Sequence, residues 1–276
     1  MLIAIILFMF IVFFCYVICL KTNSGRQVAL DSYKKTYIAH RGLFDNLKNC
    51  PENSLKAFEC AVRQGYGIEL DVQMTKDKKL VVFHDDSLKR MCNIEKKISE
   101  CTYEEIASYH LLESSQIVPL FSEVLSVIDG KVPVIIEVKT DSDYLELCEK
   151  VSEELNKYDG EYCIESFHPL VVAWFRINHP HIIRGQLSTH YRKDKINRNC
   201  IESFLLTNLL FNFYTRPDFI AYNHNYKNQF SYKLCKFFYK PINVAWTIRN
   251  KKELEEANND FDIIIFDSFI PDRNIV

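Results

Sequence analysis

Residues 67–86, GIELDVQMTKDKKLVVFHDD, contain two short apolar runs whose polar residues decide the fold. At the period of a β-strand, Glu69 and Asp71 share one face of the first run, opposite its apolar residues. The second run, LVVFH (80–84), ends on His84. Carboxylates on the face of a buried strand are costly unless a partner compensates their charge. The pattern therefore indicates strands that carry a functional site.

Strand-like and helix-like segments alternate along the rest of the chain. We expect strands over 36–40, 67–72, 80–84, 132–139, 162–167, 182–187, 218–223, 242–248 and 261–267, and helices over 54–65, 120–128 and 251–257 among others. About eight such units predict an α/β fold of the (β/α)₈ TIM barrel type. A doubly wound open sheet is the alternative, but neither G-x-G-x-x-G nor G-K-[ST] occurs in the sequence.

The first segment, LIAIILFMFIVFFCYVICL (2–20), contains no charged residue. At the rise of an α-helix it spans roughly 28 Å, close to the thickness of the bilayer interior. A cleaved signal peptide is the alternative, although no basic residue precedes the run and no small-x-small site closes it. We therefore expect a transmembrane anchor (1–20), an irregular polar tether (21–35) and a barrel domain (36–276).

The charges beside this segment predict the orientation of the chain. Lys21, Arg26, Lys34 and Lys35 follow the apolar run, whereas no basic residue precedes it. The positive-inside rule then predicts a single-pass membrane protein with its barrel on the cytoplasmic side. The ten cysteines form no C-x-x-C pair, which is typical of free thiols in a reducing compartment.

The bulk composition excludes several classes of protein. The chain has 276 residues, 48% of them hydrophobic, and a formal net charge of −2. A nucleic-acid-binding protein is expected to carry a basic excess, so we expect no nucleic-acid partner. With only 7 glycines and 8 prolines, the sequence does not resemble a disordered or low-complexity chain.

Polar residues recur where the expected strands end. The set consists of His40, Arg41, Glu69, Asp71, His84, Glu137, Lys139 and Trp246. In a (β/α)₈ barrel the carboxyl ends of the strands surround one mouth, where the active site lies. We therefore expect these side chains to converge there.

The acidic members of this set, Glu69, Asp71 and Glu137, offer hard oxygen ligands. Such ligands favour Mg²⁺ or Ca²⁺ over zinc or copper. A divalent cation also offsets the repulsion between three neighbouring carboxylates. Three separate structural salt bridges are the alternative, which the gathering of the three acids at strand ends disfavours.

The remaining polar residues suit acid–base chemistry on an anion. His40 and His84 are a candidate proton-transfer pair, because imidazole titrates near neutral pH. Arg41 and Lys139 supply fixed positive charge for a phosphate group. Together with a metal, these residues predict the hydrolysis of an anionic ester, most simply a phosphodiester.

The motifs AHRG (39–42), PENSLKAFECAVRQGYGIELDVQMTKDKKLVVFHDDSLKR (51–90), VPLFSEVL, IIEVK, ESFHP and VAWTIRN resemble the glycerophosphodiester phosphodiesterase family, whose fold is a PLC-like TIM barrel. The resemblance covers roughly residues 36–267. It implies metal-dependent hydrolysis of a glycerophosphodiester to an alcohol and glycerol 3-phosphate, in glycerophospholipid metabolism. It also assigns Phe167 and Trp246 to the glycerol or head-group side of the site.

The last strand departs from the family pattern, and two other features are interpreted from local sequence. The last strand reads DIIIFDSFIPD, where the family more often ends in a GIITDRP-like pattern, so Asp267 fills that place only loosely. Asn53, with Glu52 nearby, is either a turn or helix-cap residue or a brace of the first loop. The apolar segment FLLTNLLFNFY (204–214) is expected to pack on the barrel, with contact to a bilayer as the alternative.

Other functions remain open at this stage. The same barrel chemistry serves a lysophospholipase D-like enzyme or a cyclising lipid phosphodiesterase, so the substrate is either a soluble glycerophosphodiester or a lysophospholipid. A catalytically silent binding protein and a structural membrane protein are alternatives from other classes. Both predict a gap among the histidines or acids, and the sequence has none.

Overall fold

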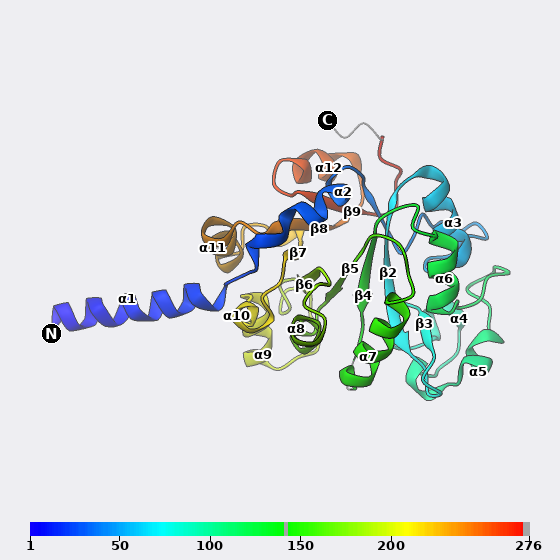
Figure 1. Ribbon diagram of the computed structural model, residues 1–276, viewed down its shortest axis with the longest axis horizontal. Helices are drawn as coiled ribbons and strands as arrows, with labels where there is room; N and C mark the ends of the chain where they lie inside the picture. Colours follow the sequence, from blue (N-terminus) through cyan, green and yellow to red (C-terminus); the bar gives the residue numbers. More distant parts are fainter. Residues whose placement is uncertain (141–142, 273–276) are drawn as a thin grey trace.

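The strand β1 pairs in parallel with both β2 and β9, and this double pairing closes the sheet on itself. The computed structural model describes residues 1–140 and 143–272. Within these residues, eight parallel strands form the ring and a ninth, β3, joins it at β2 (Figure 1). The (β/α)₈ barrel is thus confirmed, and the open doubly wound sheet is excluded. The expected domain end at residue 276 lies outside the described residues.

The strands lie close to their expected positions. They are β1 (Ile38–His40), β2 (Gly67–Met74), β3 (Leu80–Val82), β4 (Val134–Val138), β5 (Tyr162–Ser166), β6 (Arg184–Ser188), β7 (Phe219–Asn223), β8 (Ile242–Ile248) and β9 (Ile263–Phe266).

Helices lie around the ring. They are α2 (Asp31–Lys34), α3 (Leu55–Gln64), α4 (Lys89–Cys92), α5 (Tyr103–Ala107), α6 (Phe121–Ile128), α7 (Tyr144–Leu155), α8 (Pro169–Asn178), α9 (Cys200–Thr207), α10 (Asn212–Thr215), α11 (Phe230–Tyr239) and α12 (Lys251–Asn258), with 3₁₀ helices η1 (Ser24–Leu30), η2 (Ile98–Glu100) and η3 (His224–Tyr226). Of these, α2 and η1 lie across the end opposite the mouth (Figure 1). Local sequence sets the ends of α3: the Ser54 hydroxyl accepts from the Ala57 N–H, and Gly65 ends the helix in the left-handed conformation.

The strand β3 differs from the expected pattern, because it is not one of the barrel strands. It runs antiparallel to β2, with Val82 opposite Val72. It also ends at Val82, two residues before His84. The chain therefore passes beyond the mouth along β2 and returns along β3. The Phe83 N–H then donates to the Asp71 carbonyl at 2.9 Å, which brings His84 back to the mouth.

The segment 21–35 is not the irregular tether that its polar composition predicts. Most of it forms η1 and α2, and Leu30 and Tyr33 are buried against the inner residues of the strands. The Tyr33 hydroxyl donates to the Val134 carbonyl at the start of β4. Because barrel strands start at the end opposite the mouth, this segment closes the barrel there.

The N-terminal helix α1 (Leu2–Cys19) extends away from the barrel (Figure 1). It is long and apolar enough to cross a membrane, with a mean hydropathy of 3.2, and a signal sequence has the same properties. Its last turn contacts the barrel, where the Tyr239 hydroxyl donates to the Val17 carbonyl at 2.8 Å. Most of the helix is exposed.

The segment 204–214 packs on the barrel only in part. It is not one helix, because α9 ends at Thr207 and Leu209 adopts a positive φ of 58° before α10 begins. Leu206 and Leu209 are buried, whereas Phe204 and Phe213 are exposed.

Candidate active site

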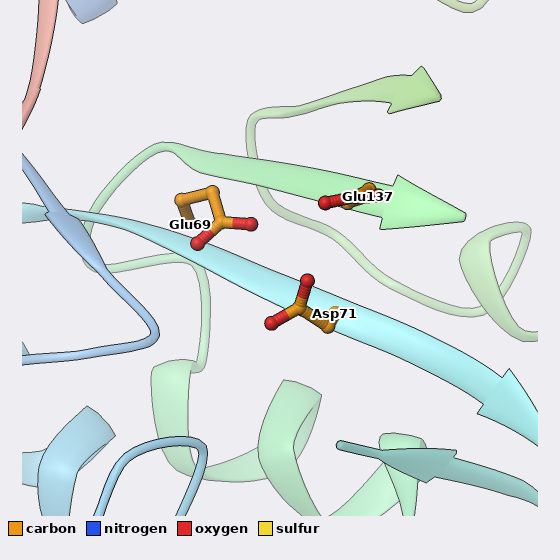
Figure 2. A group of neighbouring side chains, drawn as sticks. All are labelled: Glu69, Asp71 and Glu137. Atoms are coloured by element: carbon orange, nitrogen blue, oxygen red, sulfur yellow. The ribbon is translucent and has the colours of Figure 1, made fainter. Parts of the chain in front are cut away.

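The three acids Glu69, Asp71 and Glu137 lie side by side on β2 and β4 at the mouth of the barrel (Figure 2). One carboxylate oxygen from each lies within 4.8 Å of the others, and all three residues are buried. Strand register brings them together, because Asp71 is directly opposite Glu137. The sequence prediction that these acids converge agrees with this geometry.

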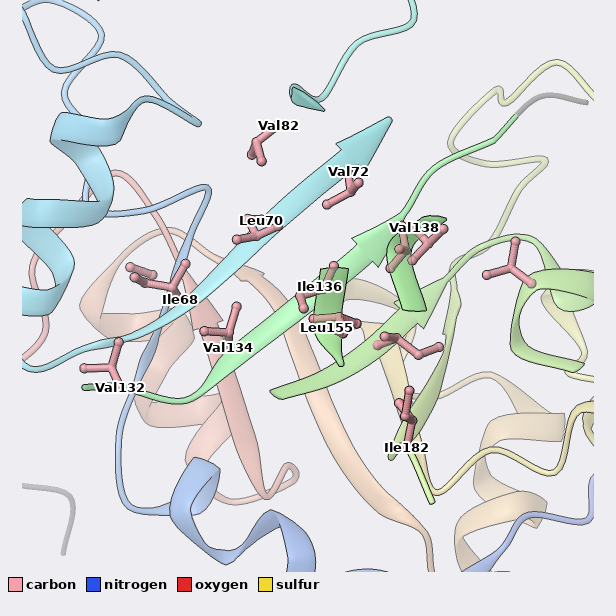
Figure 3. Close-up of a cluster of buried hydrophobic side chains, with 14 of the residues drawn as sticks. Ile68, Leu70, Val72, Val82, Val132, Val134, Ile136, Val138, Leu155 and Ile182 are labelled. Carbon is pink, nitrogen blue, oxygen red and sulfur yellow. The ribbon is translucent and has the colours of Figure 1, made fainter. Parts of the chain in front are cut away.

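The acids face the barrel axis because the residues that alternate with them on the same strands face the surrounding helices. Leu70 and Val72 of β2 and Ile136 of β4 belong to the hydrophobic core between strands and helices (Figure 3). Burying these side chains supplies the hydrophobic stabilisation of the barrel. With a side-chain period of two, the residues between them must face the barrel axis.

The acid cluster carries more negative charge than its surroundings neutralise. Burial, followed by the neighbouring carboxylates of Asp71, Glu137 and Glu165, raises the pKa of Glu69 well above its ordinary value. Burial also raises the pKa of Glu137. Burial alone would raise the pKa of Asp71 too, but Lys139, His84 and Arg41 lower it instead.

A divalent cation fits this donor set. Oδ1 of Asp71 is buried and accepts no hydrogen bond from any residue that the structure describes. A buried oxygen of this kind normally has a partner. Three convergent carboxylate oxygens are the ligands that Mg²⁺ and Ca²⁺ prefer, and a cation would relieve the repulsion that raises the pKa of Glu69 and Glu137.

Both candidate catalytic histidines are held by a carboxylate at the same ring nitrogen. Nδ1 of His40 lies 2.9 Å from Oδ2 of Asp267, and Nδ1 of His84 lies 2.6 Å from Oδ1 of Asp85. Each carboxylate orients its imidazole and leaves Nε2 available to a substrate. Nε2 of His40 is 3.9 Å from Oε2 of Glu69, so this histidine borders the acid cluster.

The two histidines have different surroundings. Burial, and then the charge of Arg41, lowers the pKa of His40 to about 4. Its imidazole is therefore neutral at neutral pH, the state that accepts a proton. The His84 side chain is 33% exposed, compared with 14% for His40.

An ion-pair chain links His84 to Arg41 around the rim. Arg90 donates to Asp85 at 2.6 Å through Nε and to Glu52 at 2.7 Å through Nη2. Glu52 also accepts a 2.6 Å hydrogen bond from Arg41. Burial would raise the pKa of Glu52, but Arg90 and Arg41 lower it to about 2. The chain of charges therefore couples the positions of the two loops that carry the histidines.

Arg41 and Lys139, the expected phosphate-binding residues, both reach the acid cluster. Nε of Arg41 lies 3.4 Å from Asp71 Oδ2, and the backbone N–H of Arg41 donates to Glu69 at 3.0 Å. Nζ of Lys139 donates to Glu137 at 2.9 Å and lies 3.4 Å from Asp71 Oδ1. The two cations thus lie next to the carboxylates expected to hold the metal.

A cavity of about 430 Å³ opens to solvent beside Glu137. Residues that line it include His84, Glu137, Lys139, Phe167, Tyr191 and Arg198. Phe167 packs edge-on against Trp246, with ring centroids 5.5 Å apart. Of the two expected aromatic residues, Phe167 therefore lines the cavity and Trp246 contacts Phe167.

The Glycerophosphoryl diester phosphodiesterase family matches residues 40–268 of the chain, a span that includes every residue of this site. The chain belongs to this family. Its expected membership is therefore confirmed.

Relatives and solved structures agree with the assignment to the glycerophosphodiester phosphodiesterase family. A glycerophosphodiester phosphodiesterase from Bacillus altitudinis is 37% identical over 156 residues, which cover 52% of this chain and 62% of that protein. A lysophospholipase D from Homo sapiens is 32% identical over 140 residues, 46% of this chain and 42% of that protein. The chain thus spans less than two thirds of either relative's length.

The fold also resembles solved structures of the family. One is a phosphodiesterase from Oleispira antarctica in complex with the product sn-glycerol-3-phosphate. It has a TM-score of 0.68 at 21% identity, and the match covers 84% of this chain and 93% of that chain. A glycerophosphodiester phosphodiesterase from Thermotoga maritima has a TM-score of 0.64 at 24% identity, with 84% and 95% covered. At these identities the likeness shows the barrel fold.

Several residues of the site were missed or misassigned from the sequence. Asn53 does not cap α3; its Nδ2 donates to Asp71 Oδ2 at 2.8 Å, so it braces a carboxylate of the acid cluster. Glu165 lies opposite Glu137 on β5, is buried, and has a pKa raised well above its ordinary value by burial and then by Glu137 and Asp71. The strand period of YCIESF indicates that Glu165 lies on one face of a strand, whereas no sequence pattern indicates a role for Asp85 or Arg90.

Proposed function

We propose that this member of the family hydrolyses a glycerophosphodiester to an alcohol and glycerol 3-phosphate at the mouth of its barrel. One observation carries the proposal: two carboxylate-oriented imidazoles, His40 and His84, flank a buried cluster of three acids and two cations. Proton transfer and charge neutralisation at a single point are what cleavage of an anionic ester requires.

Glu69, Asp71 and Glu137 would hold a divalent cation, Mg²⁺ or Ca²⁺. When bound, the cation supplies positive charge that withdraws electrons from the phosphoryl oxygens and neutralises the charge that develops on them. Oδ1 of Asp71, which accepts no hydrogen bond from the described residues and has only the Lys139 ammonium at 3.4 Å, and the raised pKa of Glu69 support this assignment.

The other side chains of the site would bind the phosphate, transfer protons and contact the rest of the substrate. Arg41 and Lys139 hold the phosphate by charge-assisted hydrogen bonds. His40, neutral because it is buried, takes the proton of the nucleophile at Nε2, so that the nucleophile's oxygen forms a bond to phosphorus. His84, at the open cavity, gives a proton to the departing alkoxide as the P–O bond breaks. Phe167 and Trp246 shape the wall beside the glycerol or head group.

The nucleophile is either water or a neighbouring hydroxyl of the glycerol. Attack by the hydroxyl would give a cyclic phosphate, which water then opens to glycerol 3-phosphate. The two routes differ in whether the cyclic product accumulates. The cyclising phosphodiesterase is thus a variant of the same chemistry.

Lysophospholipase D activity is the second candidate, and α1 favours it. We propose that α1 is a single-pass anchor, with Lys21 and Arg26 after it and the barrel on the cytoplasmic side. An anchored barrel has access to lysophospholipids in the bilayer. The name of the human relative, lysophospholipase D, agrees with this candidate.

Phosphorus NMR of reaction mixtures tests the function. The full chain in detergent would be incubated with glycerophosphocholine or with lysophosphatidylcholine, and resonances of glycerol 3-phosphate, lysophosphatidic acid and cyclic phosphates would be followed. We expect glycerol 3-phosphate from the first substrate, and lysophosphatidic acid from the second if the enzyme is a lysophospholipase D.

Two variants complete this experiment. His40→Ala is expected to abolish product formation. His181→Ala is the matched control, because His181 is exposed and precedes β6 at the opposite end of the barrel. A folded wild-type chain that hydrolyses neither substrate with Mg²⁺ or Ca²⁺ would contradict the proposed function and favour a binding protein.

A further inference from the structure

Exposed aromatic side chains occur on the helices next to the base of α1. They are Phe204 on α9, Phe213 and Tyr214 on α10, and Phe237 and Phe238 on α11, which we call the aromatic face. These five side chains are between 39% and 73% exposed. Large exposed apolar groups gathered on neighbouring elements mark an interaction surface.

Hydrogen bonds fix α1 within this face. The Tyr16 hydroxyl lies 2.5 Å from the Ser231 hydroxyl of α11, and the Tyr239 hydroxyl donates to the Val17 carbonyl. At the end of α1, the Leu20 carbonyl accepts from Asn212 of α10 and Cys235 of α11. Figure 1 shows α1 leaving the barrel beside α9, α10 and α11. The base of α1 is thus held against α10 and α11, two of the helices that carry the aromatic face.

The same part of the chain is basic. Residues 204–240 contain Arg216, Lys227, Lys233, Lys236 and Lys240, of which Lys227 forms an ion pair with Asp260. Their sole acidic residue, Asp218, is buried and forms an ion pair with Arg26. Aromatic rings combined with lysine and arginine are typical of protein surfaces that lie at the interface of a membrane with water.

We propose that the aromatic face docks on the surface of an anionic lipid bilayer, with its rings among the lipid head groups and its basic residues close to the phosphates. The proposal rests on the membrane anchoring of α1 and does not depend on the phosphodiesterase activity. A bilayer is the occupant that suits both parts of the surface. It would cover about 27 Å of apolar helix as well as the aromatic residues at its base.

Docking of α9 would bring one edge of the active-site cavity toward the lipids. Ile196 and Arg198 line the cavity, and the chain from them leads directly into α9, where Phe204 belongs to the aromatic face. A lipid diester could therefore reach the site from the bilayer. For a lipid substrate, loss of docking should reduce turnover, whereas a soluble substrate should be unaffected.

Quenching of tryptophan fluorescence by brominated lipids tests the docking. The full chain would be reconstituted in phosphatidylcholine vesicles with and without phosphatidylserine, as Phe237→Trp and, for comparison, Leu47→Trp. Leu47 is 97% exposed in the loop before α3, and α3 lies on the side of the barrel away from α1 (Figure 1). The unmodified chain supplies the background from Trp174 and Trp246.

We expect the lipids to quench the Phe237→Trp signal several-fold more than the Leu47→Trp signal, with a larger difference when phosphatidylserine is present. Equal quenching at both positions would overturn the proposal. Loss of quenching at Phe237→Trp together with chemical crosslinking between two chains would also overturn it, because a second copy would then cover the face.

A pair of substitutions gives a functional readout. Phe204→Asp with Phe237→Asp should lower hydrolysis of lysophosphatidylcholine in vesicles several-fold while hydrolysis of glycerophosphocholine is unchanged. Equal rates on the lipid would contradict the docking. Flotation of the chain with vesicles reports on anchoring by α1, and hydrolysis of glycerophosphocholine reports on the proposed function, so failure of either is distinguishable from failure of docking.

Discussion

Nδ1 of His40 lies 2.9 Å from Oδ2 of Asp267, although the two residues are 227 positions apart in the sequence. The closing of the barrel makes this contact, because β1 pairs with β9 and His40 ends one strand while Asp267 follows the other. The carboxylate fixes the orientation of the imidazole and the position of its proton, and Nε2 is left facing the acid cluster.

Replacing Asp267 should therefore impair catalysis more than binding. We expect Asp267→Asn to lower kcat about tenfold or more with little change in KM, because the imidazole loses the partner that fixes its tautomer. Steady-state kinetics on glycerophosphocholine measures both parameters. Asp129→Asn, at an exposed position before β4, is the control. Parental kcat in Asp267→Asn would show that His40 does not need this carboxylate.

The roles of the two histidines can be separated by the leaving group. We expect His40→Ala and His84→Ala each to lose about 100-fold or more on glycerophosphocholine. On a p-nitrophenyl ester of glycerol 3-phosphate, whose leaving group needs no protonation, His84→Ala should recover much of its rate because His84 faces the open cavity. Recovery in His40→Ala instead would reverse the assignment of acid and base.

The ion-pair chain at the rim should make stability depend on pH. The folded-state pKa of Glu52 is lowered to about 2, so its stabilising contribution is present above the unfolded pKa and is lost as the pH falls toward 2. Glu52→Gln should cost about 3 kcal/mol of unfolding free energy at neutral pH, and this difference should shrink between pH 5 and pH 2. Urea unfolding in detergent measures the difference in unfolding free energy between the variant and the wild type. A difference that is constant with pH would contradict the lowered pKa of Glu52.

The first loop depends on the backbone of Gly42. Its φ is +80°, and an added Cβ would lie 2.9 Å from the carbonyl carbon of Ala57. Gly42→Ala should therefore destabilise the fold by about 1–3 kcal/mol and displace the neighbouring Arg41 from Glu69. Thermal unfolding and activity report the two effects. Gly25→Ala, where a Cβ would meet nothing closer than 3.8 Å, should change neither.

The sequence predicts the barrel and the centre of its site because strand periodicity is a local signal. Glu69 and Asp71 alternate with core residues, so their inward direction and their place at a strand end are visible without a structure. The same signal applies to Glu165, which follows the buried core residue Ile164 on β5. The sequence alone does not mark Glu165 as a site residue, because no second acid lies two residues from it.

The partners of the histidines are a different case, because they depend on contacts between distant segments. Asp267 is 227 positions from His40, and Asp85, although it is next to His84 in the sequence, is held by Arg90, which also donates to Glu52, 38 positions earlier. The antiparallel direction of β3 also follows from pairing with β2 and not from its own residues. Leu30 and Tyr33 alone form too weak an apolar pattern to predict that the segment 21–35 packs against the barrel and closes it.

We propose that Glu69, Asp71 and Glu137 hold a divalent cation that phosphodiester cleavage requires. The most direct measurement is glycerol 3-phosphate release from glycerophosphocholine by EDTA-treated full chain, before and after addition of Mg²⁺ or Ca²⁺. The same assay would use Asp71→Asn and, as the control, Glu161→Gln, an exposed residue at the start of β5. We predict that one of the two ions restores release to the wild type and to Glu161→Gln but not to Asp71→Asn. Full activity in EDTA, or equal restoration of Asp71→Asn, would contradict the account.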